Sequence, residues 1–185
     1  MRIVVAITGA SGSIYAIKLL EELKRRKHEI FLIVTKNAKK IMKYEMDYDE
    51  KNLAKFSKEI YGEDSMDSKL ASGSFMYDAM VIAPCSLKSM AAIANGLALN
   101  LVARVAICCL KEGRKLIVVP RETPLDLMSL ENMVKLRRAG VVVLPAMPAF
   151  YHKPKSIDDL VNYIVGKIME QIGIEHDLYK KWRGE

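Results

Sequence analysis

The residues of this chain best placed for chemistry are an adjacent arginine and glutamate, Arg121 and Glu122. They follow an apolar run, Lys115 to Val119, that predicts a buried strand. Open α/β sheets bind ligands at the carboxyl ends of their strands, and an arginine there offers donors to an anionic ligand. We therefore expect a buried Arg–Glu pair in a ligand site. The alternative is a surface turn whose two charges pair with each other or with water.

A helix should follow this pair, over Leu125 to Arg138. Thr123 can cap its N-terminus, because a threonine hydroxyl accepts a hydrogen bond from the first helical turn. Pro124 suits the first helical position, where the N–H that proline lacks would have no partner. The turn would then hold the two charged residues between a strand and a helix.

Three more predicted strands end in hydrogen-bond donors. The first runs into Thr8-Gly9-Ala10-Ser11-Gly12-Ser13. Small residues there let a ligand approach the backbone, and a helix N-terminus favours phosphate, although an ordinary tight turn fits equally well. Thr35 ends the second strand and could cap a helix or bond a ribityl or ribose hydroxyl. The third strand ends at residues 83–89, where Ser86 is a natural N-cap. The donors there are Ser86, Lys88 and Ser89.

Two neighbouring features are less specific. Cys85 has no adjacent base, so we expect a small buried apolar residue rather than a nucleophile. The fifth strand runs into residues 145–152, where two prolines stiffen a loop whose aromatic end could cover an apolar ligand or simply pack. Taken together, the donors, helix N-termini and positive charges favour a phosphorylated, planar ligand.

Five continuous apolar runs rich in Val and Ile alternate with helical patterns, as in parallel strands buried on both faces. The predicted strands are Ile3–Ile7, Ile30–Val34, Met80–Ala83, Leu116–Val119 and Val141–Leu144. The predicted helices are Ile14–Arg26, Ala38–Tyr44, Leu87–Ala94, Leu101–Glu112, Leu125–Arg138 and one beginning at Ser156 with a capping box to Asp159. The alternation predicts a doubly wound α/β sandwich. Residues 47–66 should form a helix with loops at one edge, and the charged tail after Ile174 an arm.

Composition narrows the class of protein. The length of 185 residues suits a single domain, and the net charge of +7 favours anionic partners. Basic residues are dispersed apart from residues 24–27, which resemble the solvated end of a helix, so nucleic acid is disfavoured. Three cysteines, two of them adjacent, fit a reducing cytoplasm better than a disulfide framework. No metal-ligand cluster appears, and the longest apolar stretch, 90–110, contains enough polar residues to be two buried helices rather than a membrane span.

Five segments, in order along residues 2–174, resemble the flavin prenyltransferase family, often called UbiX. They are Gly9-Ala10-Ser11-Gly12, Ala71-Ser72-Gly73-Ser74-Phe75, Ala83-Pro84-Cys85-Ser86-Leu87-Lys88, Pro120-Arg121-Glu122-Thr123-Pro124-Leu125 and Met147-Pro148-Ala149-Phe150-Tyr151-His152. The resemblance implies a flavodoxin-like, Rossmann-like three-layer sandwich with a mainly parallel sheet. It also implies a dodecamer with active sites between subunits.

The implied reaction joins a dimethylallyl group from dimethylallyl monophosphate to N5 of reduced FMN and then closes a ring onto C6. The product, prenylated FMN, would serve a UbiD-type decarboxylase. No metal is implied, so positioned cations and hydrogen bonds would stabilise the departing phosphate.

The resemblance also implies roles for individual residues. FMN would contact Gly9, Ala10, Ser11, Thr35, Ser86, Leu87, Lys88, Ser89 and Arg121. Tyr151 and Lys167 would hold the dimethylallyl phosphate. Positive charge at that phosphate would come from Lys111, Arg104 and Arg121, and arginine suits the task because it donates in a bidentate fashion.

The remaining implied roles concern protons and covering of the site. Glu122 would handle protons or orient the phosphate. Glu45 would reach in from a neighbouring subunit, and Ser72 lies in a loop of similar role. Trp182 would belong to a C-terminal arm, about residues 175–185, that can close over the site.

Two positions depart from the family pattern, since Leu99 and Ile107 stand where relatives tend to have aspartate. Neither carries an implied catalytic role, so the departures bear on subunit contacts. One alternative is a flavoprotein decarboxylase of peptidyl- or pantothenoyl-cysteine, which uses a histidine near the first helical region. This chain has no histidine before His28 and none from there to Tyr151. The other alternative is a non-catalytic FMN carrier.

Overall fold

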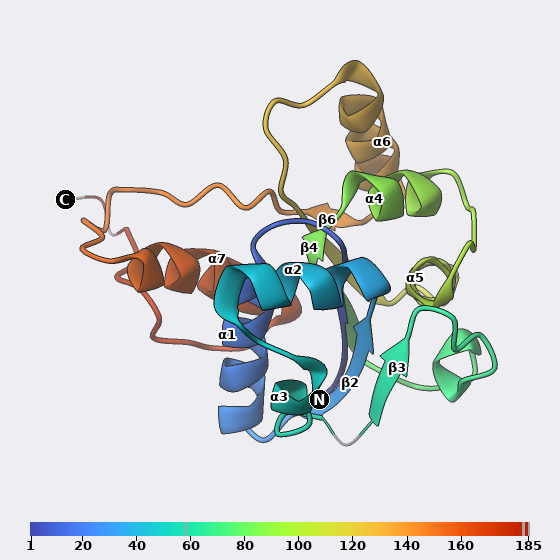
Figure 1. Ribbon diagram of the computed structural model, residues 1–185. Helices are drawn as coiled ribbons and strands as arrows, with labels where there is room; N and C mark the ends of the chain where they lie inside the picture. The colour runs from blue at the N-terminus through green and yellow to red at the C-terminus, as the bar shows by residue number, and fades with distance from the viewer. Residues whose placement is uncertain (58, 183, 185) are drawn as a thin grey trace.

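The computed structural model describes residues 1–57, 59–182 and 184. Its strands form one parallel sheet in the order β3-β2-β1-β4-β5-β6 (Figure 1). The strands are β1 Arg2–Ile7, β2 Glu29–Val34, β3 Glu59–Gly62, β4 Ala79–Cys85, β5 Lys115–Pro120 and β6 Val142–Val143. In the central register Ile3 lies opposite both Ile30 and Ala79. The residues Ile3 to Ile7 are fully buried, as expected of a parallel strand covered on both faces.

Helices cover both faces of the sheet. They are α1 Ser13–Arg25, α2 Lys36–Met46, α3 Glu50–Leu53, the 3-10 helix η1 Lys69–Ala71, α4 Leu87–Ala94, α5 Leu101–Lys111, α6 Leu127–Arg138 and α7 Ile157–Ile172. Because strand side chains alternate, Val5 packs with α1, α2, α3 and α7 in one core, whereas Val4 packs with η1, α4, α5 and α6 in the other. The three-layer α/β sandwich expected from the sequence is confirmed.

The edge strand β3 was not expected. Residues 47–66 contain the expected short helix, α3, but Glu59–Gly62 pairs in parallel with β2 from Phe31 to Val34. Its four residues are all half-buried. A strand this short and this mixed in polarity shows no apolar run, so it depends on β2 for its conformation.

Helix α6 begins later than the sequence indicated. Its N-cap is Asp126, whose carboxylate accepts hydrogen bonds from the Ser129 N–H at 3.0 Å and the Ser129 hydroxyl at 2.6 Å. The proposed cap at Thr123 and first helical position at Pro124 are therefore wrong. The Asp126 carboxylate accepts both hydrogen bonds from one buried residue, so the helix begins after Asp126. Residues 121–126 form a loop that leads from β5 to α6 (Figure 1).

The chain changes direction between β1 and β4. It winds outward from β1 through β2 to β3, then crosses back to β4 and winds the other way through β5 to β6. The loops after β1 and β4 therefore leave the sheet at a topological switch point, and doubly wound proteins bind their ligands in the crevice outside the carboxyl ends of such strands.

Candidate functional site

Thr8 joins the ends of β1 and β4 at this switch point. Its buried hydroxyl donates a hydrogen bond to the Pro84 carbonyl oxygen at 2.8 Å and accepts one from the Ser86 N–H at 2.7 Å. One side chain therefore fixes the spacing of two loops that we expected to contact a ligand. We assigned it no role from the sequence, although a threonine that ends an otherwise apolar strand is a usable signal.

The loop after β1 presents backbone to the crevice. Gly12 has a φ of 99°, a left-handed conformation that favours glycine. A Cβ at Gly9 would lie 2.7 Å from the Cβ of Asn37, so even alanine would force the loop and α2 apart. Together with Ala10 and Ser11, these residues form a narrow edge to which a planar ligand can come close.

Glu45 occupies the N-terminus of α1. Its carboxylate accepts hydrogen bonds from the Gly12 N–H at 3.0 Å and 3.1 Å and from the Ser13 N–H at 3.0 Å. Burial alone would raise the pKa of Glu45, but these bonds, with one from Ser11, outweigh burial and lower it. Within one chain, the Glu45 carboxylate of α2 therefore contacts the loop after β1. That Glu45 reaches into a neighbouring subunit stays a prediction.

Thr35 and Ser86 cap the helices beside this loop. The Thr35 hydroxyl accepts a hydrogen bond from the Ala38 N–H at 3.2 Å, and the Ser86 hydroxyl accepts one from the Ser89 N–H at 3.3 Å. No hydrogen bond donated by the Thr35 hydroxyl is found among the described residues, so its proton is available to a ligand, whereas the Ser86 hydroxyl donates to the Ser89 hydroxyl at 3.0 Å. At the same end of α4, which begins at Leu87, Lys88 is exposed and has no ion-pair partner among the described residues.

Arg121 extends from the end of β5 to the loop after β1. Its Nε donates to the Ser11 carbonyl oxygen at 3.2 Å, which orients the guanidinium at the crevice. Glu122 is exposed and accepts a hydrogen bond from the Thr123 N–H at 3.1 Å. Across the described residues no hydrogen bond or ion pair joins Arg121 to Glu122, so the expected buried pair is wrong. Each of the two side chains instead forms a hydrogen bond with a backbone group. We call the residues at the ends of β1, β2, β4 and β5 the strand-end group.

A second group surrounds Tyr151 and is called the aromatic group. The Tyr151 ring lies 5.9 Å from the ring of Trp182 and 6.0 Å from that of Tyr163, measured between centroids. His152 stacks on Tyr163 at 5.4 Å. The loop before α7 therefore packs against the C-terminal arm. Lys167 of α7 lies beside this group, and its positive charge acts to lower the pKa of Tyr151, which burial raises.

The third group lies on η1 and α5. Arg104 donates from Nε to the Ala71 carbonyl oxygen at 3.0 Å, directly before Ser72, and Lys111 pairs with Glu112 at 3.2 Å. Of the described residues, none of these makes a hydrogen bond, ion pair or ring contact with the strand-end or the aromatic group. Within the described part of one chain, the expected phosphate cations Arg104 and Lys111 therefore have local partners of their own.

Cys85 is not a nucleophile in this fold. Its side chain is fully buried, and burial raises the pKa of the thiol to about 12. Because the thiolate is the reactive form, the interpretation of Cys85 as a small apolar residue is confirmed.

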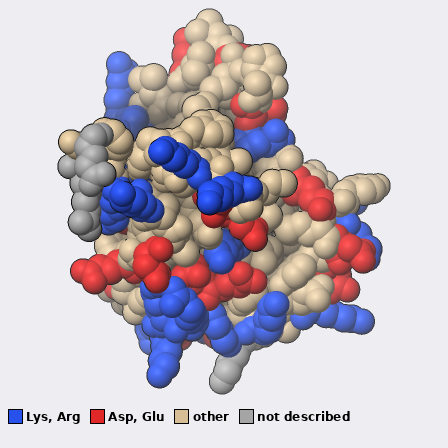
Figure 2. Space-filling model, turned by 90° about the vertical axis from the view of Figure 1, so that its left-hand side faces the viewer, with Lys and Arg blue, Asp and Glu red and all other residues tan. Residues whose placement is uncertain are grey.

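The surface is mixed in charge. On the face seen in Figure 2, Lys and Arg alternate with Asp and Glu rather than forming an unbroken basic patch. Over the described residues there is no group of three or more metal-ligating His, Cys, Asp or Glu side chains. In the same residues no helix is both long and apolar enough to cross a bilayer.

The fold and the switch-point crevice define a nucleotide-binding α/β protein. The chain belongs to the Flavoprotein family, whose model matches residues 1–169. It is 50% identical over 182 residues to the flavin prenyltransferase UbiX of Methanocaldococcus jannaschii, with 98% of each chain covered. At this identity and coverage, it belongs more narrowly to the UbiX flavin prenyltransferases.

Solved structures agree with this assignment. A UbiX protein in complex with FMN and dimethylallyl pyrophosphate superposes with a TM-score of 0.97 at 40% identity, over 100% of this chain and 98% of that one. A dodecameric FMN-dependent UbiX-like decarboxylase from Escherichia coli O157:H7 superposes with a TM-score of 0.96 at 39% identity, over 100% of both chains.

Proposed function

We propose that this protein transfers a dimethylallyl group from dimethylallyl monophosphate to N5 and C6 of reduced FMN and releases prenylated FMN and phosphate. The observation that carries the proposal is the convergence of four donor-bearing strand ends at the switch point, two of them joined by Thr8. It is supported by membership of the UbiX family and by a relative's complex with FMN and a dimethylallyl phosphate ester.

The strand-end group fits FMN. The backbone at Gly9, Ala10 and Ser11 is small enough for a flat ring system, and the hydroxyl of Thr35 suits a ribityl chain. The N-terminus of α4, with the exposed ammonium of Lys88, suits a phosphate. Reduced FMN supplies the nucleophilic ring positions, and Arg121 lies where it can orient the ring against the loop after β1.

The chain's cations handle the leaving group. As the allylic C–O bond breaks, negative charge collects on the phosphate oxygens, and the ammonium of Lys167 and the hydroxyl of Tyr151 hold those oxygens. Arg104 and Lys111 add positive charge, which replaces the role of a metal ion. Glu122 accepts the proton released when the new ring closes.

Completion of the site requires a second copy of the chain. Among the described residues, Arg104, Lys111 and Ser72 make no hydrogen bond or ion pair with the strand-end group, so we infer that they act on a neighbour's site. Helix α6 offers an apolar face for such assembly, with Leu127, Leu130 and Val134 at 65%, 44% and 48% exposure. We propose a dodecamer, as described for the Escherichia coli relative. Each copy would be one flavin-binding domain over residues 1–185, in the cytoplasm, supplying a UbiD-type decarboxylase.

The test is anaerobic incubation of the purified protein with reduced FMN and dimethylallyl monophosphate, followed by mass spectrometry of the extracted flavin. We expect a flavin heavier by one five-carbon unit, formed equally well after removal of metal ions with a chelator. Glu122→Gln should bind FMN but give no such product, whereas Glu21→Gln, an exposed glutamate on α1, should behave as the parent. A parallel reaction with the pyrophosphate identifies the donor.

Other outcomes would support the alternatives. Tight binding of unmodified FMN, unaffected by Glu122→Gln and Lys111→Ala, would indicate a carrier. Release of CO₂ from an aromatic acid or a cysteine-terminated substrate by this protein alone would indicate a decarboxylase.

A further inference from the structure

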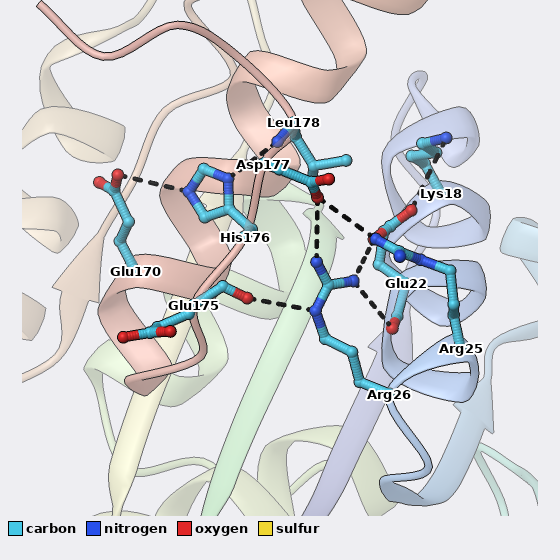
Figure 3. Close-up of polar contacts among 9 residues, drawn as sticks. All are labelled: Lys18, Glu22, Arg25, Arg26, Glu170, Glu175, His176, Asp177 and Leu178. Carbon is cyan, nitrogen blue, oxygen red and sulfur yellow. Dashed lines mark hydrogen bonds and ion pairs between the residues drawn. The ribbon is translucent and has the colours of Figure 1, made fainter.

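Glu170 on α7 is the centre of a charged cluster outside the strand-end group. Its carboxylate accepts hydrogen bonds from the Lys167 ammonium at 2.9 Å and the Tyr179 hydroxyl at 2.9 Å, and pairs with the Lys181 ammonium at 3.2 Å. His176 approaches the same carboxylate at 3.3 Å (Figure 3). Lys167 belongs to the helix, whereas the other three belong to the arm, residues 175–182. One carboxylate thus connects the helix to the arm.

No sequence pattern predicted this cluster, because the four partners of Glu170 lie between three positions before it and eleven after it, on two different elements. Burial would raise the pKa of Glu170, but the hydrogen bonds from Lys167, Tyr179 and Lys181 outweigh it and lower the pKa to about 2. The carboxylate is therefore charged at neutral pH. Lys167 is close enough to Tyr151 for its charge to act to lower the pKa of that hydroxyl, and the flexible Lys167 side chain is 39% exposed. Its ammonium also lies 5.9 Å from the centroid of the Tyr179 ring, and the Tyr179 hydroxyl in turn donates to Glu170, so both contacts of the ammonium depend on this carboxylate.

The arm has a second anchor on α1. Arg26 donates from Nε to the Glu175 carbonyl oxygen at 3.1 Å, and both Arg25 and Arg26 approach Asp177 at 3.4 Å (Figure 3). Both arginines also pair with Glu22, whose side chain is only 8% exposed. Residues 24–27 are therefore more than the solvated helix end that the sequence indicated.

Gly166 provides independent evidence that the arm is fitted to α7. A Cβ at this position would lie 2.5 Å from Cε1 of Tyr179 and 2.6 Å from Cε1 of His176. A glycine inside a helix normally costs stability relative to alanine. Here its absent side chain makes room for the two arm residues that contact Glu170.

We propose that Glu170 is a positioning residue, whose carboxylate holds Lys167 and the arm together and thereby sets the Lys167 ammonium and the Trp182 indole beside Tyr151. The proposal rests on the proposed function, because it takes Tyr151 and Lys167 as the residues that hold the dimethylallyl phosphate. In chemical terms, the Glu170 carboxylate does not touch the substrate but orients the Lys167 ammonium, which does.

The kinetic test compares the two substrates in Glu170→Gln. The amide keeps the shape of the side chain but loses the charge that attracts Lys167 and Lys181. We expect the KM for dimethylallyl monophosphate to rise about tenfold, in keeping with the loss of a charge-assisted hydrogen bond, while kcat and the KM for FMN change less than about twofold. The matched control is Glu175→Gln, an exposed arm glutamate whose backbone, not its side chain, contacts Arg26. It should match the parent.

A direct readout of the arm is available because Trp182 is the only tryptophan in the chain. Trp182 is 63% exposed in the docked arm, so full release should raise acrylamide quenching of its fluorescence about 1.6-fold. We expect this rise in Glu170→Gln and in Gly166→Ala, and none in Glu175→Gln. Gly166→Ala displaces the arm but leaves the Lys167–Glu170 pair intact, so its effect on KM should be smaller than that of Glu170→Gln.

The outcomes separate this proposal from the proposed function. An unchanged or lowered KM for the allylic donor in Glu170→Gln would overturn it, as would a KM effect no larger than that of Gly166→Ala. Unchanged quenching in Glu170→Gln would overturn the docking role of the carboxylate. If the parent protein transfers no prenyl group, the proposed function fails first, and the quenching experiment still decides whether Glu170 docks the arm.

Discussion

Ser86 donates its backbone N–H to the hydroxyl of Thr8 at 2.7 Å and so fixes the two loops of the switch point to each other. Thr8 is fully buried, and its hydroxyl also donates to the Pro84 carbonyl oxygen. Valine at this position would keep the shape but leave the part-buried Ser86 N–H without its acceptor, while the Pro84 carbonyl oxygen would keep only the Thr8 N–H at 3.3 Å. We expect Thr8→Val to lower the free energy of unfolding by about 2–3 kcal/mol, measured by urea denaturation.

The same substitution should weaken FMN binding, because both flanking loops carry expected FMN contacts. Thr8→Ser retains the hydroxyl and serves as the control, with a smaller loss of stability. Equal stability of the valine and parent proteins would show that the hydroxyl is not what joins the strands.

Glu45 stabilises the N-terminus of α1 through its charge. Glu45→Gln keeps one acceptor oxygen but removes the negative charge facing the N–H groups of Gly12 and Ser13. We expect a loss of about 0.5 kcal/mol at pH 7, since the carboxylate is exposed and the interaction is screened. Because the folded pKa of Glu45 is lowered, its contribution is complete above the ordinary value of 4.5 and is lost as pH falls through the folded pKa. The difference between parent and variant should therefore shrink in acid, and a constant difference would contradict this account.

The three buried cysteines should resist alkylation in the folded protein. With a pKa of about 12, Cys85 has about a thousandfold less thiolate at pH 8 than an ordinary cysteine. We expect no rapid incorporation of iodoacetamide into native protein at pH 8, measured by intact mass. Urea-denatured protein should take up three equivalents, which provides the control. Rapid labelling of Cys85 in native protein would show that this thiol is accessible.

His176 should make docking of the arm pH-dependent. Its side chain is fully buried, its Nδ1 accepts a hydrogen bond from the Leu178 N–H at 3.2 Å, and its Nε2 faces Glu170. Burial lowers its pKa below 6.5, against the opposing effect of Glu170. The neutral ring is thus the docked form, so its contribution is complete above pH 6.5 and is lost as pH falls below it.

We therefore expect acrylamide quenching of Trp182 to increase as pH falls from 8 to 5. His176→Gln, which can still accept and donate, should remove that dependence. Glu170 does not interfere, because its pKa of about 2 places its titration at lower pH. Quenching that stays level in the parent across this range would contradict the prediction.

The start of α6 can be tested with a matched pair of alanine substitutions. Asp126→Ala removes the cap that accepts two hydrogen bonds from Ser129 and should cost about 1 kcal/mol of stability in thermal or urea unfolding. Thr123→Ala should have little effect, because the helix does not begin there. A larger loss of stability in Thr123→Ala than in Asp126→Ala would show that Thr123 is the N-cap, as the sequence indicated.

The sequence by itself determined the layers, most of the elements and the family. Continuous Val- and Ile-rich runs specify strands buried on both faces, and the caps at Thr35, Ser86 and Ser156 formed as expected because each depends only on residues three positions away. The strand-end donors were predictable for a similar reason, since every strand of a parallel sheet ends at the same edge.

The tertiary structure decided what depends on partners distant in the chain. Strand β3 exists because β2 offers it an edge, and Thr8 acquires its role from a strand 76 residues later. Arg121 and Glu122 are adjacent, yet their side chains form hydrogen bonds with two different backbone groups, which no local sequence pattern indicates. Glu170 and Gly166 had no distinguishing pattern at all. Their importance arises only when the arm folds back on α7, because a long-range contact is set by the packing of whole elements rather than by the propensities of neighbouring residues.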